Sequence, residues 1–141
     1  MMPAVAISRV LLDRIVVETI RDRSVEACGL LLGHDLRVDA VQPCRNVAAD
    51  PATRFEIDPA ALLAAHRRAR AGGPAVIGSY HSHPRGRAEP SPRDAADAAP
   101  DGSIWIVAAG STLTAWRAVA AGPLHGRFEP LALAAACRSA R

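Results

Sequence analysis

The stretch GSYHSHPRGRAEPSPRDAAD, residues 78–97, places His81 and His83 two positions apart at the end of an apolar run. That run, residues 75–80, follows a Gly-Gly-Pro sequence and carries β-branched residues, which is typical of a buried strand. Side chains alternate along a strand, so the two imidazoles would share one face, with their Cα atoms about 6.5–7 Å apart. Two imidazoles at this separation can bind one cation. Pro84 has no N–H group and is expected to end the strand pairing.

The end of the same stretch, Ser91-Pro92-Arg93-Asp94, contains the residues that begin helices. Serine at the N-cap, proline at the first helical position and an acid at the third are all favoured there. Asp94 would lie in the first turn, within reach of the strand end. Two histidine nitrogens and one carboxylate oxygen leave a fourth position open, which is the arrangement of catalytic zinc sites. Taken separately, the histidine pair can be incidental and Ser91-x-x-Asp94 can be a plain capping box.

A second motif lies far upstream, where residues 26–33 read EACGLLLG. Together with the His-x-His-Pro, Ser and Asp pattern of residues 81–94, it resembles the signature of the JAMM (MPN-plus) zinc metalloproteases. The resemblance implies a zinc (Zn2+) site with three ligands, His81, His83 and Asp94. It also implies that Glu26 is the general base and that Ser91 stabilises the oxyanion without binding the metal. The expected activity is therefore peptide or isopeptide hydrolysis by a metal-activated water.

Composition limits the alternatives. The chain has 141 residues, half of them apolar, so we expect one folded domain over residues 1–141 and no long disordered region. No apolar run approaches the roughly 20 residues that span a bilayer, and charges interrupt the N-terminus where a signal peptide would be apolar. The three cysteines, Cys28, Cys44 and Cys137, show no metal-binding spacing and are interpreted as free thiols in a reducing cytoplasm. The net charge of +3 comes without any lysine, which excludes a lysine Schiff base, and few aromatic residues argue against nucleic-acid binding.

Periodicity predicts an α/β fold in which a layered mixed sheet is flanked by helices. Such a layered fold, similar to that of the cytidine deaminases, is also what the resemblance to JAMM domains implies. The expected helices cover residues 8–23, 58–71 and 91–99. The expected strands cover residues 25–33, 36–47, 55–57, 75–83, 103–109, 112–118 and 127–134. The first two strands and the pair 103–109 and 112–118 are expected to form hairpins, and the alanine-rich end, residues 131–141, could equally be helical.

The spacing after Asp94 bears on the substrate. Only eight residues separate Asp94 from Ser103, which leaves little room for the insertions that bind ubiquitin chains in the eukaryotic members of the family. The resemblance is therefore to the compact prokaryotic branch, which acts at the C-terminal Gly-Gly tail of small ubiquitin-like sulfur-carrier proteins. The alternatives are a non-catalytic MPN-type interaction module and a RadC-like DNA-associated protein. A zinc deaminase is excluded because its Pro-Cys-x-x-Cys motif is absent, while the carrier, the exact product and the presence of a homodimer stay open.

Overall fold

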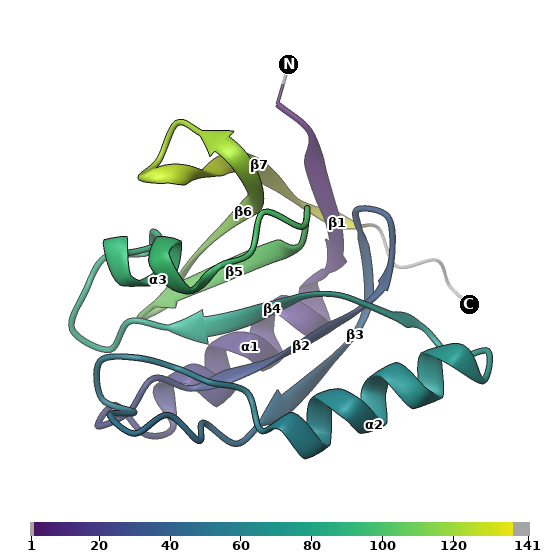
Figure 1. Cartoon of the computed structure of the whole chain (residues 1–141), viewed down its shortest axis with the longest axis horizontal. Coiled ribbons are helices and arrows are strands. Elements are labelled where there is room, and N and C mark those ends of the chain that lie inside the picture. Colours follow the sequence, from purple (N-terminus) through teal and green to yellow (C-terminus); the bar gives the residue numbers. More distant parts are fainter. Residues whose placement is uncertain (1, 137–141) are drawn as a thin grey trace.

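The main feature of the computed structural model, which describes residues 2–136, is a sheet that closes on itself (Figure 1). The strands are β1 (Ala4–Ser8), β2 (Cys28–His34), β3 (Arg37–Cys44), β4 (Ala75–Ser82), β5 (Ile104–Ala109), β6 (Thr112–Gly122) and β7 (Gly126–Ala136). The helices are α1 (Arg9–Ile20), α2 (Pro59–Arg70) and α3 (Pro92–Asp97). None of the helices in the described residues is long and apolar enough to cross a bilayer.

The order of the strands corrects the predicted layered sheet. The strands run β1-β3-β2-β4-β5-β6-β7 around a barrel, and β1 pairs in parallel with both β3 and β7. The pairing of β1 with β7 joins residues 4–8 to residues 132–136 and so closes the circle. Strand β1 was not predicted, because it is only five residues long and has too few residues to display a period. The fold is still α/β, with mixed pairing and with helices packed against the sheet.

Most predicted elements occupy their expected places. The two expected hairpins are present as antiparallel β2–β3 and β5–β6, and β2 is central, paired with β3 and β4. Ser8 caps α1 by accepting a hydrogen bond from Leu11 N–H at 3.2 Å, and Asp58 caps α2 in the same way. The short strand expected at 55–57 is wrong, because only an isolated bridge between Asn46 and Ile57 forms there. The helical alternative for the C-terminus is wrong up to residue 136, which is strand β7, and Cys137 lies outside the described residues.

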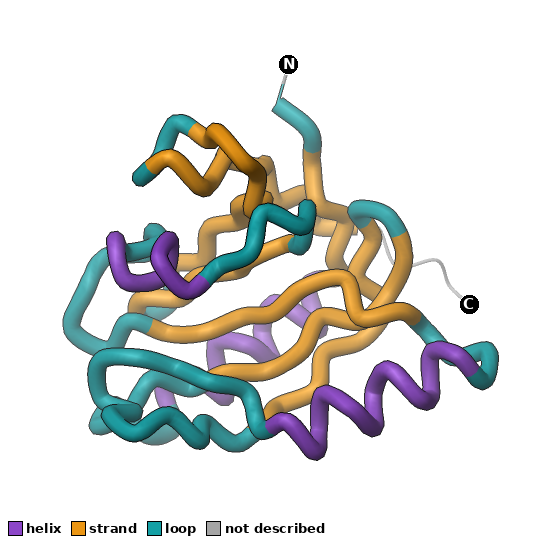
Figure 2. The backbone as a smooth tube through the Cα atoms, in the orientation of Figure 1, coloured by secondary structure: helices purple, strands orange, loops and turns teal. Residues whose placement is uncertain are grey.

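Two apolar cores divide the side chains of the sheet. Ile104 and Ile106 of β5 pack with Ile15 of α1, whereas Trp105, between them in sequence, packs with Phe128 in a second cluster that includes residues of α3. Strand alternation explains the division. The same alternation on β4 places Tyr80 in the cluster that includes Ile15 and turns the side chain of His81 toward Trp105. The long loops, coloured teal in Figure 2, gather near the end of β4, where the candidate site lies.

Candidate metal centre

The histidine pair lies at the end of β4. His81 is opposite Cys28 on β2 and Val107 on β5, and it is completely buried. His83 follows the last residue of β4, and its N–H donates to the carbonyl of Ala108 at 2.8 Å, so the chain stays extended past the strand. The two Nε2 atoms lie 3.1 Å apart. The expected convergence of the two imidazoles is therefore present.

Asp94 reaches the histidines from the first turn of α3. Ser91 is the N-cap and forms a complete capping box with Asp94: the Asp94 N–H donates to Ser91 Oγ at 3.0 Å, and the Ser91 N–H donates to Asp94 Oδ2 at 2.9 Å. Asp94 Oδ2 also lies 3.0 Å from His81 Nε2 and 3.1 Å from His83 Nε2. The cap thus fixes the carboxylate of Asp94 in the position where it meets both rings.

The resulting triangle has the dimensions of a metal site. Ligand atoms about 2.0–2.1 Å from a tetrahedral zinc ion would lie about 3.3 Å from one another, and the three atoms here lie 3.0–3.1 Å apart. Two nitrogens and one carboxylate oxygen are a donor set that suits zinc. The side chains present therefore fit a bound divalent metal ion, with a fourth position left for water or substrate.

Neighbouring groups hold each ring in the orientation that a ligand needs. His83 Nδ1 lies 2.8 Å from the carbonyl oxygen of Arg87, to which a protonated Nδ1 donates. This contact leaves the lone pair of Nε2 for a metal, as outer hydrogen bonds do in known zinc sites. The ring of His81 stacks on Phe55 at a centroid distance of 4.2 Å and meets Trp105 edge-on at 5.6 Å. His81 Nδ1 has no hydrogen-bond partner within the described residues, so packing orients the ring on that side, and the contact with Asp94 orients it at Nε2.

Glu26 brings a fourth group to the cluster. Its carboxylate, the two histidines and Asp94 offer ligand atoms that all lie within 4.8 Å of one another. The side chain is buried, and Oε1 has no hydrogen-bond partner within the described residues. A buried carboxylate oxygen without a partner is costly unless a water or substrate atom completes it. Glu26 also lines one open cleft together with His83 and Ser91, so its carboxyl group lies where a reacting molecule can approach.

Burial sets the ionisation of Glu26. Loss of hydration raises the pKa of its carboxyl from 4.5 to about 7, the nearby His83 opposes this rise, and the charge of Asp94 adds to it. A carboxyl group with a pKa near neutrality can both accept and return a proton. Such a pKa is typical of catalytic acids and bases.

The other three groups form one charge-balanced network. Burial by itself would raise the pKa of Asp94, but contacts with His81 and His83 outweigh burial and hold the pKa below its usual value. Burial lowers the pKa of His81. Burial also opposes protonation of His83, but hydrogen bonds to Asp94 and to the Arg87 carbonyl prevail and raise its pKa. Asp94 is thus an anion at neutral pH and can offset the charge of a cation between the rings.

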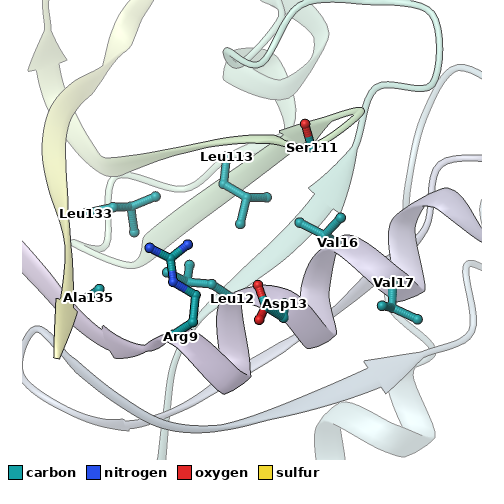
Figure 3. A pocket seen from close by; sticks show the side chains of 9 residues that line it. All are labelled: Arg9, Leu12, Asp13, Val16, Val17, Ser111, Leu113, Leu133 and Ala135. Carbon is teal, nitrogen blue, oxygen red and sulfur yellow. The ribbon is translucent and has the colours of Figure 1, made fainter. Parts of the chain in front are cut away.

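An open cleft leads to this cluster. It has a volume of about 390 Å³, and Glu26, His83 and Ser91 line it together with Thr53 and Arg85 from the two flanking loops. A larger cleft of about 620 Å³ lies beside α1, where Figure 3 shows Arg9, Asp13 and several apolar side chains. None of the predicted site residues lines the larger cleft. The smaller cleft is therefore the one lined by candidate catalytic and metal-binding residues.

Three residues around the cluster were not predicted to take part in it. Phe55 stacks on His81, Ser82 accepts a hydrogen bond from Ala27 N–H at 2.9 Å, and Asn46 donates to the carbonyl of Glu26 at 2.8 Å. Strand alternation is a signal for Ser82, because it must point away from the face shared by the two histidines. No local pattern marks Asn46. Cys28 is buried in β2 as expected, with a pKa raised by burial to about 12, so it is an inert thiol.

Comparisons with known proteins agree with this geometry. Residues 8–119 match the family model described as prokaryotic homologs of the JAB domain. A "Probable TtuB-protein conjugate cleaving protease" from Thermus thermophilus is 38% identical over 92 residues, which cover 65% of this chain and 62% of that protein. A "Desampylase" from Haloferax volcanii is 35% identical over 88 residues, which cover 61% of this chain and 63% of that protein. The matched region thus spans slightly less than two thirds of the length of these relatives.

Solved structures share the fold. The solution structure of protein DSY2949 from Desulfitobacterium hafniense has a TM-score of 0.74 and 24% identity over 92% of each chain. The solution structure of a protein from Salinibacter ruber has a TM-score of 0.65 and 29% identity, covering 94% of this chain and 92% of that one. The architecture is therefore one that other prokaryotic proteins adopt over nearly their whole length.

Proposed function

The chain belongs to the family of prokaryotic homologs of the JAB domain, and on this basis we propose that it is a metal-dependent peptide or isopeptide hydrolase. One observation carries the proposal: Glu26, His81, His83 and Asp94 come from separate parts of the chain, and their ligand atoms lie within 4.8 Å of one another. A scaffold without chemistry has no need to bury an unpartnered carboxylate beside two imidazoles, because each such group costs stability.

In this proposal the metal is zinc, which His81, His83 and Asp94 would hold through Nε2, Nε2 and Oδ2. When bound, a zinc ion supplies Lewis acidity, which makes water more acidic and polarises a carbonyl group. The Arg87 carbonyl keeps the proton of His83 on Nδ1, and the Ser91 N–H orients the carboxylate of Asp94. These contacts prepare the ligands before the metal binds.

Glu26 performs the proton transfers. With a pKa near 7, a substantial fraction of its carboxyl is ionised at neutral pH and can take a proton from the attacking water. The carboxylate of Glu26, which lies beside the two histidines, accepts this proton. As the tetrahedral intermediate breaks down, the same carboxyl group returns the proton to the leaving amine nitrogen. No covalent bond to the protein forms at any stage.

Ser91 stabilises the oxyanion of that intermediate. In the capping box its Oγ acts as an acceptor from Asp94 N–H, which uses a lone pair and leaves the hydroxyl hydrogen available. The hydrogen can therefore be donated to the substrate carbonyl oxygen as negative charge develops there. Capping the helix and assisting the reaction are thus compatible uses of one hydroxyl group.

The substrates we propose are conjugates or extensions of small ubiquitin-like carrier proteins, cut at the C-terminal Gly-Gly tail. A conjugate as substrate is supported by the names of two relatives, a "Probable TtuB-protein conjugate cleaving protease" and a "Desampylase". A cleft of about 390 Å³ is small, and a Gly-Gly tail is a slender chain that can enter it. Sulfur-carrier proteins are the class that we expect to bear this tail.

Further predictions from the sequence belong to this proposal. They are one domain over residues 1–141, a cytoplasmic location in which the thiols stay reduced, and a fold akin to that of the cytidine deaminases. Two copies of the chain could also form a homodimer. The alternatives, a non-catalytic interaction module and a RadC-like DNA-associated protein, would retain the fold without this activity.

The test is cleavage of a carrier. The zinc-loaded chain is incubated with ubiquitin-like carriers from the same genome, each extended beyond its Gly-Gly end, and the products are identified by intact mass. We expect cleavage after the second glycine, its loss with a chelator, and its recovery with added zinc. Stoichiometric zinc binding without cleavage of any carrier would reject the hydrolase and favour the interaction module. Salt-dependent binding to DNA would support the RadC-like alternative.

A further inference from the structure

Glu26 stands in a part of the backbone that no regular element holds. It lies between the end of α1 at Ile20 and the start of β2 at Cys28. A residue outside a helix or sheet lacks the repeated hydrogen bonds that fix backbone position. A general base must nevertheless hold its oxygen within hydrogen-bond reach of the reacting proton. Some other group has to fix Glu26.

The side chain of Asn46 supplies the contact. Its Nδ2 donates to the carbonyl of Glu26 at 2.8 Å and to the carbonyl of Arg54 at 3.0 Å, with a longer contact of 3.4 Å to Pro51. Its Oδ1 accepts from the N–H groups of Ala48 at 3.0 Å and Glu56 at 3.1 Å. One amide side chain thus uses both its donor and acceptor sides in a single loop, residues 46–57.

This loop also binds the opposite side of Glu26. The Glu26 N–H donates to the carbonyl of Pro51 at 2.7 Å, so that the N–H and C=O of the same residue are both held by groups of the loop. Asn46 fixes the loop at Arg54 and Glu56 as well. If the side chain of Asn46 were lost, both hydrogen bonds of the Glu26 backbone would weaken together.

The same contacts connect Glu26 to the ligands. Glu56, whose N–H binds Asn46, follows Phe55, whose ring stacks on His81. On the other side, Ser82 exchanges two hydrogen bonds with Ala27, the residue after Glu26, at 2.9 and 3.0 Å. Contacts on two sides therefore fix the position of Glu26 relative to β4, and the contacts on one of these sides depend on Asn46.

We propose that Asn46 is a positioning residue: it acts through Glu26 by fixing where the carboxylate stands relative to the metal ligands. The inference rests on the proposed hydrolase function. The position favours an amide, because its NH2 group donates to the carbonyls of both Glu26 and Arg54 while its oxygen accepts from Glu56 N–H, and a single hydroxyl group has only one hydrogen to donate. Aspartate in place of Asn46 has nearly the same shape. Its carboxylate oxygen would face the carbonyl oxygens of Glu26 and Arg54, to which it cannot donate a hydrogen bond.

The experiment compares Asn46→Ala and Asn46→Asp with Gln42→Ala as the matched control. Gln42 is also an amide residue, lies four positions earlier on β3, and bonds only Arg68 through its side chain within the described residues. We expect both Asn46 variants to fold and to bind one zinc ion. Their kcat should fall about tenfold to a hundredfold with little change in KM, as for a misplaced catalytic group. Gln42→Ala should match the wild type.

Two further readouts separate positioning from a general loss of structure. Amide hydrogen exchange should become faster at Glu26 and Ala27 in both Asn46 variants and stay unchanged in β4. In the background of Glu26→Gln, the Asn46→Ala change should reduce the residual rate no further, because its effect passes through Glu26.

The outcomes distinguish the two hypotheses. A wild-type chain that cleaves no carrier would reject the proposed function. The hydrogen-exchange measurement alone would then decide whether Asn46 positions Glu26: faster exchange at Glu26 and Ala27 would support this role, and unchanged exchange would overturn it. A wild-type chain that cleaves, beside Asn46 variants that cleave equally fast, would overturn the positioning role alone. Loss of zinc or of folding in both variants would assign Asn46 to the fold and overturn the proposal as well.

Discussion

Replacing Glu26 by glutamine is expected to stabilise the metal-free protein at alkaline pH. Glu26 is buried and, without a metal ion, its charged form lacks an adequate partner. In the folded state its pKa lies at about 7, above the ordinary value of 4.5. As the pH rises from 4.5 to 7, the unfolded chain loses this proton while the folded chain keeps it, so the free energy of unfolding falls. Glutamine has nearly the same shape and carries no charge to bury.

The magnitude follows from the same numbers. A pKa that rises from 4.5 to about 7 corresponds, at roughly 1.4 kcal/mol for each tenfold change in proton affinity, to about 3 kcal/mol once Glu26 is fully ionised. Below pH 4.5 the carboxyl is neutral in both states and this penalty is absent. The advantage of Glu26→Gln should therefore be near its maximum at pH 8 and small at pH 4.5.

The assay is urea unfolding of both proteins after treatment with a chelator, at pH 8 and at pH 4.5. His81 and Asp94 titrate in both proteins, so their contributions largely cancel in the difference, whereas loss of the Glu26 charge also lowers the pKa of His83. Equal differences in the free energy of unfolding at the two pH values, or a destabilised variant at pH 8, would refute the argument that a buried charge at Glu26 limits stability. Added zinc should reduce the difference in the free energy of unfolding between the two proteins, because a nearby cation favours the ionised carboxyl group of Glu26.

Four further outcomes are expected. Glu26→Gln should bind zinc normally and cleave about a hundredfold to ten-thousandfold more slowly, as is usual for loss of a general base; full turnover in a zinc-loaded sample would remove Glu26 from the mechanism. His81→Ala should lose the metal, so an unchanged zinc content by elemental analysis would exclude it as a ligand. Zinc affinity should fall with acidification, because the raised pKa of His83 means that protons compete for Nε2; calorimetric titrations at pH 8 and pH 6 measure this, and equal affinities would contradict it. Gly78→Ala should destabilise the fold by about 3 kcal/mol, the upper range for overpacking, because its Cβ would collide with the backbone carbonyl of Ile104; thermal melts check this, and an unchanged melting temperature would count against the close approach of β4 and β5.

The convergence of His81, His83 and Asp94 could be predicted from the sequence, because local rules place these three side chains. Strand alternation aligns His81 with His83, and the capping box directs Asp94 back toward the strand end, so each step depends on neighbours within a few residues. Glu26 is different. Its place beside the histidines depends on the pairing of β2 with β4, across about fifty residues, and only the resemblance to a family motif indicated it.

The features that the sequence did not predict depend on long-range pairing or on side chains. Barrel closure needs β1 to meet β7, and nothing within residues 4–8 specifies that partner. The expected strand at 55–57 failed because Glu56 gives its N–H to the side chain of Asn46 instead of to a neighbouring strand. A competing side-chain hydrogen bond of this kind leaves no periodic signal in the sequence.

The pairing of β1 with β7 has a consequence for synthesis on the ribosome. The residues that gather at the cleft lie between positions 26 and 94, whereas the closing pair joins positions 4–8 to 132–136. A nascent chain can bring the histidines, the aspartate and the glutamate together before β7 has been translated. Until then, the edge of β1 that pairs with β7 has no partner. Contacts between residues so distant along the chain form slowly. An unpaired strand edge can pair with strands of other chains, so we expect aggregation to be favoured in the interval before β7 emerges from the ribosome.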